Sequence, residues 1–160
     1  MKSEREQVVE HLEYLLLGGG AHLDLAKAVA DFPGELRGKT VDGSKHSAWQ
    51  LLDHMRICQW DILEFSRDPN HVSPDWPEGC WPKSPEPPSE SAWDDCLESI
   101  KNDLNEMLAL IRDPKNDLYK PFEHGDGQTL LREALLFADH NAYHLGQIVY
   151  LRRLLGCWSE

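Results

Sequence analysis

Four long segments of the chain place apolar residues three and four positions apart, which is the spacing of one face of an α-helix. No segment of comparable length alternates apolar and polar residues in the manner of a half-buried β-strand. Amphipathic helices of this length bury their apolar faces against one another, so the pattern predicts an all-α protein and favours a four-helix bundle. The predicted helices cover residues 3–17, 47–67, 91–112 and 129–155.

Capping and helix-breaking residues define the boundaries of these segments. Three glycines at 18–20 follow the first segment, and inside a helix they would cost about 3 kcal/mol relative to alanine. A short helix is expected over residues 24–31, with Asp24 as its N-cap. Ser47 and Gln50 form an S-x-x-Q capping box at the start of the second long helix. The second and third long helices each end just before a proline, and Gly156 suits the position after the fourth.

The connection between the second and third long helices, from Asp68 to Pro88, has 21 residues and holds seven of the ten prolines. We call this segment the crossover. Connections of this length usually serve as a crossover, a lid or a binding loop. Proline lowers the entropic cost of ordering the segment, and Trp76 and Trp81 can anchor it to the bundle. We expect it to allow a helix order that a short turn would forbid, while a direct role in substrate binding stays open.

Composition bounds the size of the fold and the choice of partners. The 160 residues fit one domain, residues 1–160, with a substantial core. With 16 Lys and Arg against 28 Asp and Glu, the formal net charge is −12, which argues against nucleic acid or an anionic membrane as the main partner. No apolar run approaches the roughly 20 residues that span a bilayer, and MKSEREQ does not resemble a signal peptide. The four cysteines form no C-x-x-C pair, so we expect free thiols and a cytoplasmic protein.

Histidines interrupt two of the apolar faces. His140 and His144 lie one helical turn apart on the apolar face of the fourth long helix, with their Cβ atoms about 6 Å apart. His54 lies on the apolar face of the second long helix, between Leu51 and Ile57. Ring nitrogens in a dry core need partners, and one cation shared by three imidazoles would satisfy all three. If the two faces meet, the pattern favours a metal site at His54, His140 and His144 over three separately satisfied histidines.

Two familiar metal motifs are missing from the chain. Asn141 follows His140 where a zincin-type protease has glutamate, so the H-E-x-x-H motif is absent. Di-iron carboxylate bundles use inward Glu-x-x-His motifs, and no histidine here has a glutamate three residues before it. A P-loop, a G-x-G-x-x-G loop and a G-x-S-x-G elbow are also absent. The absence of these motifs argues against a zincin-type protease, a di-iron carboxylate protein, a P-loop or dinucleotide-binding protein and an α/β-hydrolase.

Four further residues are weaker candidates for the site. Cys58 lies one turn after His54 and could be a fourth metal ligand, although a buried free cysteine more often fills a core. Asp61, two turns after His54, could lean toward the site or stay solvated. His22 would reach the level of His54 if the first two long helices run antiparallel, and Gln147 could orient a ligand or simply pack. We expect the remaining histidines to be surface residues: His11, His46, His71 and His124.

The motifs around the three histidines resemble those of a known family. The stretch SAWQLLDH, which ends at His54, and the stretch DHNAYHLGQ, which begins at Asp139, closely resemble the DinB/YfiT-like superfamily. The resemblance extends over essentially the whole chain and implies a four-helix bundle with one divalent metal on His54, His140 and His144. The family uses zinc or nickel most often, with iron or manganese as further choices, and homodimers are common. Its characterised members include thiol-dependent transferases and isomerases, which use bacillithiol, mycothiol or glutathione, and metal-dependent hydrolases.

Two functional hypotheses remain at this point. In the first, the protein is a metalloenzyme, because three neutral imidazoles leave a zinc ion an open position for water or a small thiol. It would then be a hydrolase or a thiol S-transferase with a small-molecule substrate, and Asp61 and His22 are the candidates for a general base. In the alternative, the metal belongs to a non-catalytic module with a structural, sensor or stress-response role. Cys58 as a fourth ligand would favour this alternative.

Overall fold

The observed helices begin and end close to the predicted boundaries. The computed structural model describes residues 2–158. Within that range the only β pairing is an isolated bridge between Pro121 and Thr129, so the all-α prediction is confirmed. None of the described helices combines the length and the apolar character that crossing a bilayer requires. The elements are α1 (Glu4–Leu17), α2 (Leu25–Val29), the 3-10 turn η1 (Gly34–Leu36), α3 (Ala48–Arg67), α4 (Ala92–Arg112) and α5 (Leu130–Leu154).

Side-chain caps explain why several helices start where they do. Ser47 accepts a hydrogen bond from the backbone N–H of Gln50, whose side chain in turn accepts one from the backbone N–H of Ser47. This is the predicted capping box of α3. Asp24 and Thr129 cap α2 and α5 by accepting a backbone N–H in the first turn. Ser91 makes no such bond, so α4 begins without a side-chain cap.

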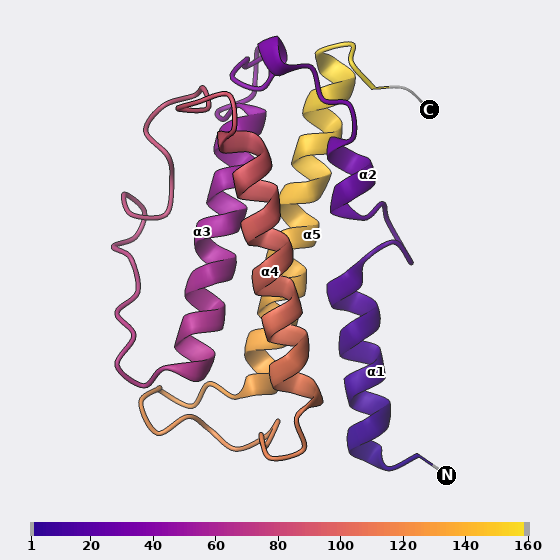
Figure 1. Ribbon diagram of the computed structural model, residues 1–160, viewed down its shortest axis with the longest axis vertical. Coiled ribbons are helices and arrows are strands. Elements are labelled where there is room, and N and C mark those ends of the chain that lie inside the picture. The colour runs from indigo at the N-terminus through magenta and orange to yellow at the C-terminus, as the bar shows by residue number, and fades with distance from the viewer. Residues whose placement is uncertain (1, 159–160) are drawn as a thin grey trace.

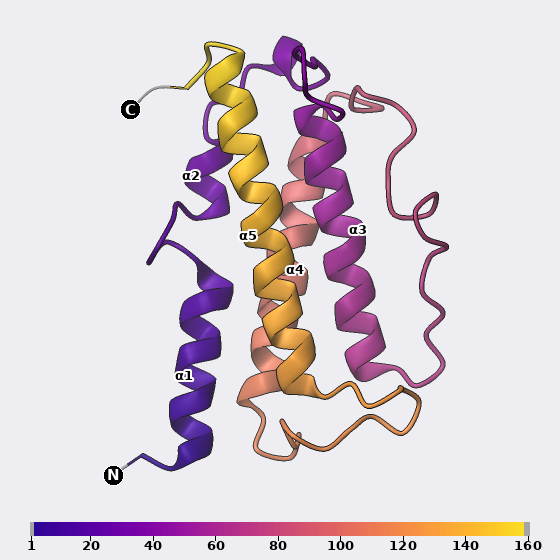
Figure 2. The same cartoon turned by 180° about the vertical axis from the view of Figure 1, so that it is seen from behind.

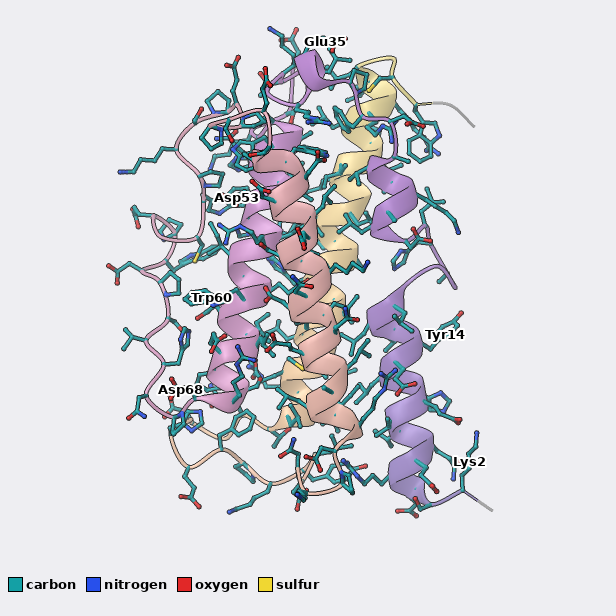
Figure 3. All side chains as sticks on the ribbon, in the orientation of Figure 1. Lys2, Tyr14, Glu35, Asp53, Trp60 and Asp68 are labelled. Atoms are coloured by element: carbon teal, nitrogen blue, oxygen red, sulfur yellow. The ribbon has the colours of Figure 1, made fainter. Side chains whose placement is uncertain are left out.

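The four long helices lie side by side, with α1 and α5 running in one direction and α3 and α4 in the other (Figure 1). Because α3 and α4 are parallel, the chain must return along the bundle between them. The crossover makes this return beside α3, on the side facing away from α1 (Figure 2). It begins at Asp68, just past the end of α3 (Figure 3). The parallel pair is the helix order that a short turn would not allow.

Two hydrophobic clusters fill the bundle, one toward each end. The first joins α2 to the beginnings of α3 and α4 and the end of α5, and the second joins α1 to the opposite ends of the same helices. On α5 the last buried residue of the second cluster is Phe137, and the first buried residue of the first cluster is Ile148. His140 and His144 lie between these two positions, at the junction of the clusters. The fold therefore places the polar candidates at mid-height in the bundle.

Two leucines within the apolar pattern of the helices do not belong to the core. Leu15 on α1 is 47% exposed and Leu136 on α5 is 36% exposed, whereas their neighbours Leu16 and Phe137 are buried. Successive residues of a helix are about 100° apart around its axis, so a neighbour of a core residue can face solvent. The segment of α1 around Leu15 and the segment of α5 around Leu136 therefore bury a narrower stripe than the apolar spacing of the sequence suggests.

Candidate metal centre

One stripe of α3 faces the crossover along most of its length. Its members are Ser47, Gln50, His54 and Asp61, and their spacings of three, four and seven residues place them on one side of the helix. Partners further along the crossover meet residues closer to the start of α3, so the crossover runs antiparallel to the helix. The hydrogen bonds are Ser47 Oγ to Pro85 O (2.5 Å), Gln50 Nε2 to Pro82 O (3.2 Å), His54 Nδ1 to Cys80 O (2.7 Å) and His71 Nε2 to Asp61 Oδ1 (2.7 Å).

Trp81 of the crossover lies between two histidine rings. Its ring stacks on His54 with centroids 3.7 Å apart and planes 5° apart, and on His46 with centroids 3.9 Å apart and planes 14° apart. The edge of Trp81 also meets the His144 ring at 5.9 Å. The prediction that the tryptophans anchor the crossover is confirmed for Trp81. Trp76 makes a weaker contact with the His54 ring, with centroids 6.3 Å apart and planes tilted by 53°, and it is 70% exposed, so it contributes little to the anchoring.

The structure brings the three predicted metal ligands together. The ring centroids of His54 and His144 are 4.6 Å apart, those of His54 and His140 are 5.0 Å apart, and those of His140 and His144 are 4.5 Å apart. His54 Nε2 and His140 Nε2 face each other at 3.1 Å across the α3–α5 interface. The condition that the two helix faces meet is therefore fulfilled. That these residues bind a metal stays a prediction.

Hydrogen bonds to Nδ1 of His54 and of His144 determine that the other ring nitrogen, Nε2, carries the lone pair. The carbonyl of Cys80 can only accept, so His54 must carry its proton on Nδ1 and its lone pair on Nε2. His144 Nδ1 lies 2.7 Å from Gln147 Oε1, which assigns the same tautomer to His144 and shows that Gln147 orients the His144 ring. Metal-binding histidines in proteins are held in this way, with the second ring nitrogen donating to an oxygen. The residues present therefore fit a divalent metal ion.

The three imidazoles are neutral at physiological pH. Burial lowers the pKa of His54 to about 4, against a smaller raising effect of its bond to Cys80, and burial together with the two neighbouring rings lowers the pKa of His140 to about 4. Burial also lowers the pKa of His144, although the bond to Gln147 opposes the shift. Neutral imidazole is the form that binds metal ions, so protons do not compete for these nitrogens near pH 7.

Cys58 lies at the edge of the histidine cluster. Its Sγ is 3.5 Å from His54 Nδ1 and 3.8 Å from His54 Nε2. Among the described residues, the set whose ligand atoms all lie within 4.8 Å of one another is His54, Cys58 and His140, and His144 is outside that set. Burial raises the pKa of the Cys58 thiol to about 12, so the group is protonated in the absence of an ion. A candidate metal site is thus present, with Cys58 as well as His144 beside the His54–His140 pair.

The two candidates for a general base lie outside the histidine cluster. Asp61 accepts a hydrogen bond from His71. Burial is the main cause that raises the pKa of the nearby thiols of Cys58 and Cys80, and the charge of Asp61 adds to it. His22 is exposed and its Nδ1 bonds the carbonyl of the next residue. It lines a small cavity with Met55, Gln59 and Asn141. This cavity is at the level of His54 along the bundle, but it lies on a different side of α3 from the crossover. His22 therefore lies at the level of the bundle that was expected, and its role in the site stays a prediction.

Two histidines expected on the surface are parts of the crossover contact. The side chain of His71 is 8% exposed, bonds Asp61 and meets the ring of Trp60 edge-on, with ring centroids 5.1 Å apart. His46 is half-buried against Trp81. Both lie in loops, where sequence alone suggests exposure. The sequence carries no signal for their burial, because it depends on how the crossover packs against the bundle. His11 and His124 are exposed as expected.

Comparison with known proteins places this fold and site in a family. The family model described as the DinB superfamily matches residues 21–148, which is well over half of the chain. The chain therefore belongs to the DinB superfamily, a superfamily of metal-binding proteins. The matched range includes all three predicted histidine ligands and the whole crossover. Neither the search of curated proteins nor the search of solved structures gave a match.

Proposed function

We propose that this protein is a divalent-metal enzyme in which His54, His140 and His144 hold the ion and a small thiol or a water molecule is the nucleophile. The observation that carries the proposal is the set of three neutral imidazoles from two helices, of which His54 and His144 are buried and oriented by an acceptor on Nδ1, while His140 is half-buried. Zinc and nickel suit three imidazole ligands best. The products would be those of a thiol S-transferase or a hydrolase.

Three protein ligands are typical of catalytic rather than structural zinc sites, because a coordination position stays open. A bound divalent ion supplies Lewis acidity, which makes a thiol or water nucleophilic near neutral pH. The protein's own contribution is to orient the rings and to limit the access of water. Trp81 covers one face of His54, and the Cys80 carbonyl holds the proton on Nδ1 of the same ring.

The hydrogen-bonded pair of Asp61 and His71, which lies outside the histidine cluster, is a candidate acceptor for the proton that the nucleophile loses. A carboxylate that accepts from one nitrogen of an imidazole orients the ring so that the other nitrogen can accept a proton. His71 belongs to the crossover, so the proton acceptor would be in place only while the crossover lies on α3. This assigns Asp61 a supporting position rather than the role of the base itself.

A closed, non-catalytic metal site is the second candidate, and the position of Cys58 favours it. Its sulfur lies close enough to join His54 and His140 in one coordination shell. Four protein ligands would complete a tetrahedral zinc site and leave no position for a substrate. The metal would then stabilise the junction between the two hydrophobic clusters.

Activity and stability measurements separate the two candidates. Zinc-loaded and nickel-loaded protein would be assayed with glutathione or bacillithiol plus an electrophile, and with nitrophenyl esters. His140→Ala removes a predicted ligand, and His11→Ala replaces an exposed histidine on α1 as the matched control. We expect turnover in the wild type and in His11→Ala and none above background in His140→Ala. Equal turnover in all three proteins would refute the enzyme proposal, and a loss of many degrees of Tm on chelation would favour the closed site.

A further inference from the structure

Another cavity lies beside the predicted metal site, at the end of the bundle where α3 begins and α5 ends. Its volume of about 510 Å³ is within the range of small-molecule sites in proteins. The loop between η1 and α3, which passes over this end of the bundle, forms one wall (Figure 1). The other wall is a stripe of α5 residues three and four positions apart: Gln147, Tyr150, Leu151 and Leu154.

The floor of this cavity is apolar. Leu51 of α3 is 4% exposed and Leu151 of α5 is 3% exposed, so both lie at the bottom of the cavity. Tyr150 is 64% exposed and Leu154 is 50% exposed, which places them at its rim. A hollow with apolar walls buries the apolar part of a ligand, while a few polar groups determine which ligand binds.

Two charged side chains of opposite sign line the same cavity. They are Asp42 and Lys45, both exposed, and neither belongs to an ion pair among residues 2–158. Ser44 holds their loop in shape, because its backbone N–H donates to Val41 O at 2.9 Å and its Oγ donates to His46 O at 2.7 Å. A pair of unlike charges complements a ligand that carries both a carboxylate and an ammonium group.

Gln147 offers a free hydrogen-bond donor to the cavity. Its Oε1 accepts from His144 Nδ1 at 2.7 Å, so its NH₂ group is left for another acceptor. Gln147 Nε2 has no partner among the described residues and is not enclosed by protein, so a molecule in the cavity can reach it. The amide therefore connects the cavity to a predicted metal ligand, with its oxygen on His144 and its NH₂ group available.

We propose that this cavity binds an amino-acid zwitterion with a bulky apolar side chain. The carboxylate of the ligand accepts from the Gln147 amide and pairs with Lys45, while its ammonium group pairs with Asp42. Its apolar side chain lies on the leucine floor. The ligand meets His144 only through Gln147, so it occupies a site of its own beside the metal centre. This inference goes beyond the proposed function, because binding of the zwitterion needs no metal ion.

Calorimetric titration of the protein as purified tests the class of ligand with three related probes. L-phenylalanine carries both charges, phenylpropionate lacks the ammonium group and phenethylamine lacks the carboxylate. We expect saturable binding of L-phenylalanine and binding weaker by about 3- to 10-fold or more for each of the other two, since each leaves one charge of the cavity without its partner. No saturable binding of L-phenylalanine up to about 10 mM, or equal affinity for all three probes, would overturn the inference.

A pair of lysine substitutions locates the bound carboxylate. Lys45→Met removes the charge and keeps most of the side-chain length, so the Kd for L-phenylalanine should rise about 3- to 10-fold. Lys39→Met is the matched control, because Lys39 is an exposed residue of the same loop that does not line the cavity. Both lysines are exposed, so neither substitution threatens the fold. Wild-type affinity in Lys45→Met would contradict the assigned position of the carboxylate.

Side-chain amide signals in nitrogen-15 NMR supply a local readout. Those of Gln147 should shift as L-phenylalanine binds, whereas those of Gln59, which is buried and donates to the carbonyl of Ile100, should not. Shifts at Gln59 without shifts at Gln147 would place the ligand elsewhere and overturn the inference. These titrations need no added zinc, so a protein that binds no zinc contradicts the proposed function alone, and one that binds no L-phenylalanine contradicts this inference alone.

Discussion

Replacing Trp81 with alanine should loosen the crossover and destabilise the protein. The substitution removes two stacked aromatic contacts, with His54 at 3.7 Å and with His46 at 3.9 Å between ring centroids. Such pairs contribute about 0.5–1.5 kcal/mol each beyond the area they bury, which gives about 1–3 kcal/mol for the two. Truncation of a fully buried tryptophan costs about 3–5 kcal/mol, and Trp81 is only partly buried. We therefore expect a loss of about 2–3 kcal/mol, or roughly 4–12 °C in Tm for a chain of this size.

Urea unfolding of metal-free protein measures this loss, and Trp76→Ala is the matched control. Trp76 lies on the same crossover but is 70% exposed, so its replacement should change the free energy of unfolding by no more than about 0.5 kcal/mol. Hydrogen exchange adds a local readout, because backbone amides of the crossover should lose protection in Trp81→Ala before those of the helices. Equal destabilisation by the two substitutions would refute the view that Trp81 is the anchor.

Three further substitutions have defined outcomes. Ser47→Ala removes the acceptor for the Gln50 backbone N–H and should cost about 1 kcal/mol in urea unfolding, so an unchanged midpoint would contradict the capping role. The hydrogen bond from the Lys27 backbone N–H lowers the pKa of Asp24 in the folded protein. The ionised Asp24 side chain therefore contributes stability above its unfolded pKa of about 3.9, and this stability is lost as the pH falls through the lower folded pKa. Asp24→Asn should remove this part of the acid dependence of Tm, and an unaltered acid limb would exclude it. Arg152→Leu leaves two carbonyl oxygens without their donor, so we expect a loss of about 2 kcal/mol or more, and a loss below about 0.5 kcal/mol would refute the importance of these bonds.

The helix boundaries could be predicted because local chemistry decides them. The side chain of Ser47 caps its own helix, and Gly18 adopts a positive φ of 66° at the end of α1, where the glycine triplet predicted a break. The width of each buried face could not be predicted in the same way. Leu15 and Leu16 are equivalent in hydrophobicity, and only the position of the neighbouring helices decides which of them is buried.

The histidine cluster was predictable in part for the same reason. His140 and His144 share a helix face by periodicity alone, and the placement of His54 opposite them follows from the apolar faces meeting in the core. The acceptor for His54 could not be predicted, because it is the backbone carbonyl of Cys80 and a carbonyl has no sequence signature. The burial of His71 was likewise hidden, since it depends on the register of the crossover against α3.

Elemental analysis of untagged protein tests the central claim of a three-histidine metal site most directly. The proteins to compare are the wild type, His54→Ala, His144→Ala and Cys58→Ser. We predict one equivalent of divalent metal in the wild type and in Cys58→Ser, and none in the two histidine variants. Metal retained by either histidine variant, or lost from Cys58→Ser, would contradict the assignment of His54, His140 and His144 as the three ligands.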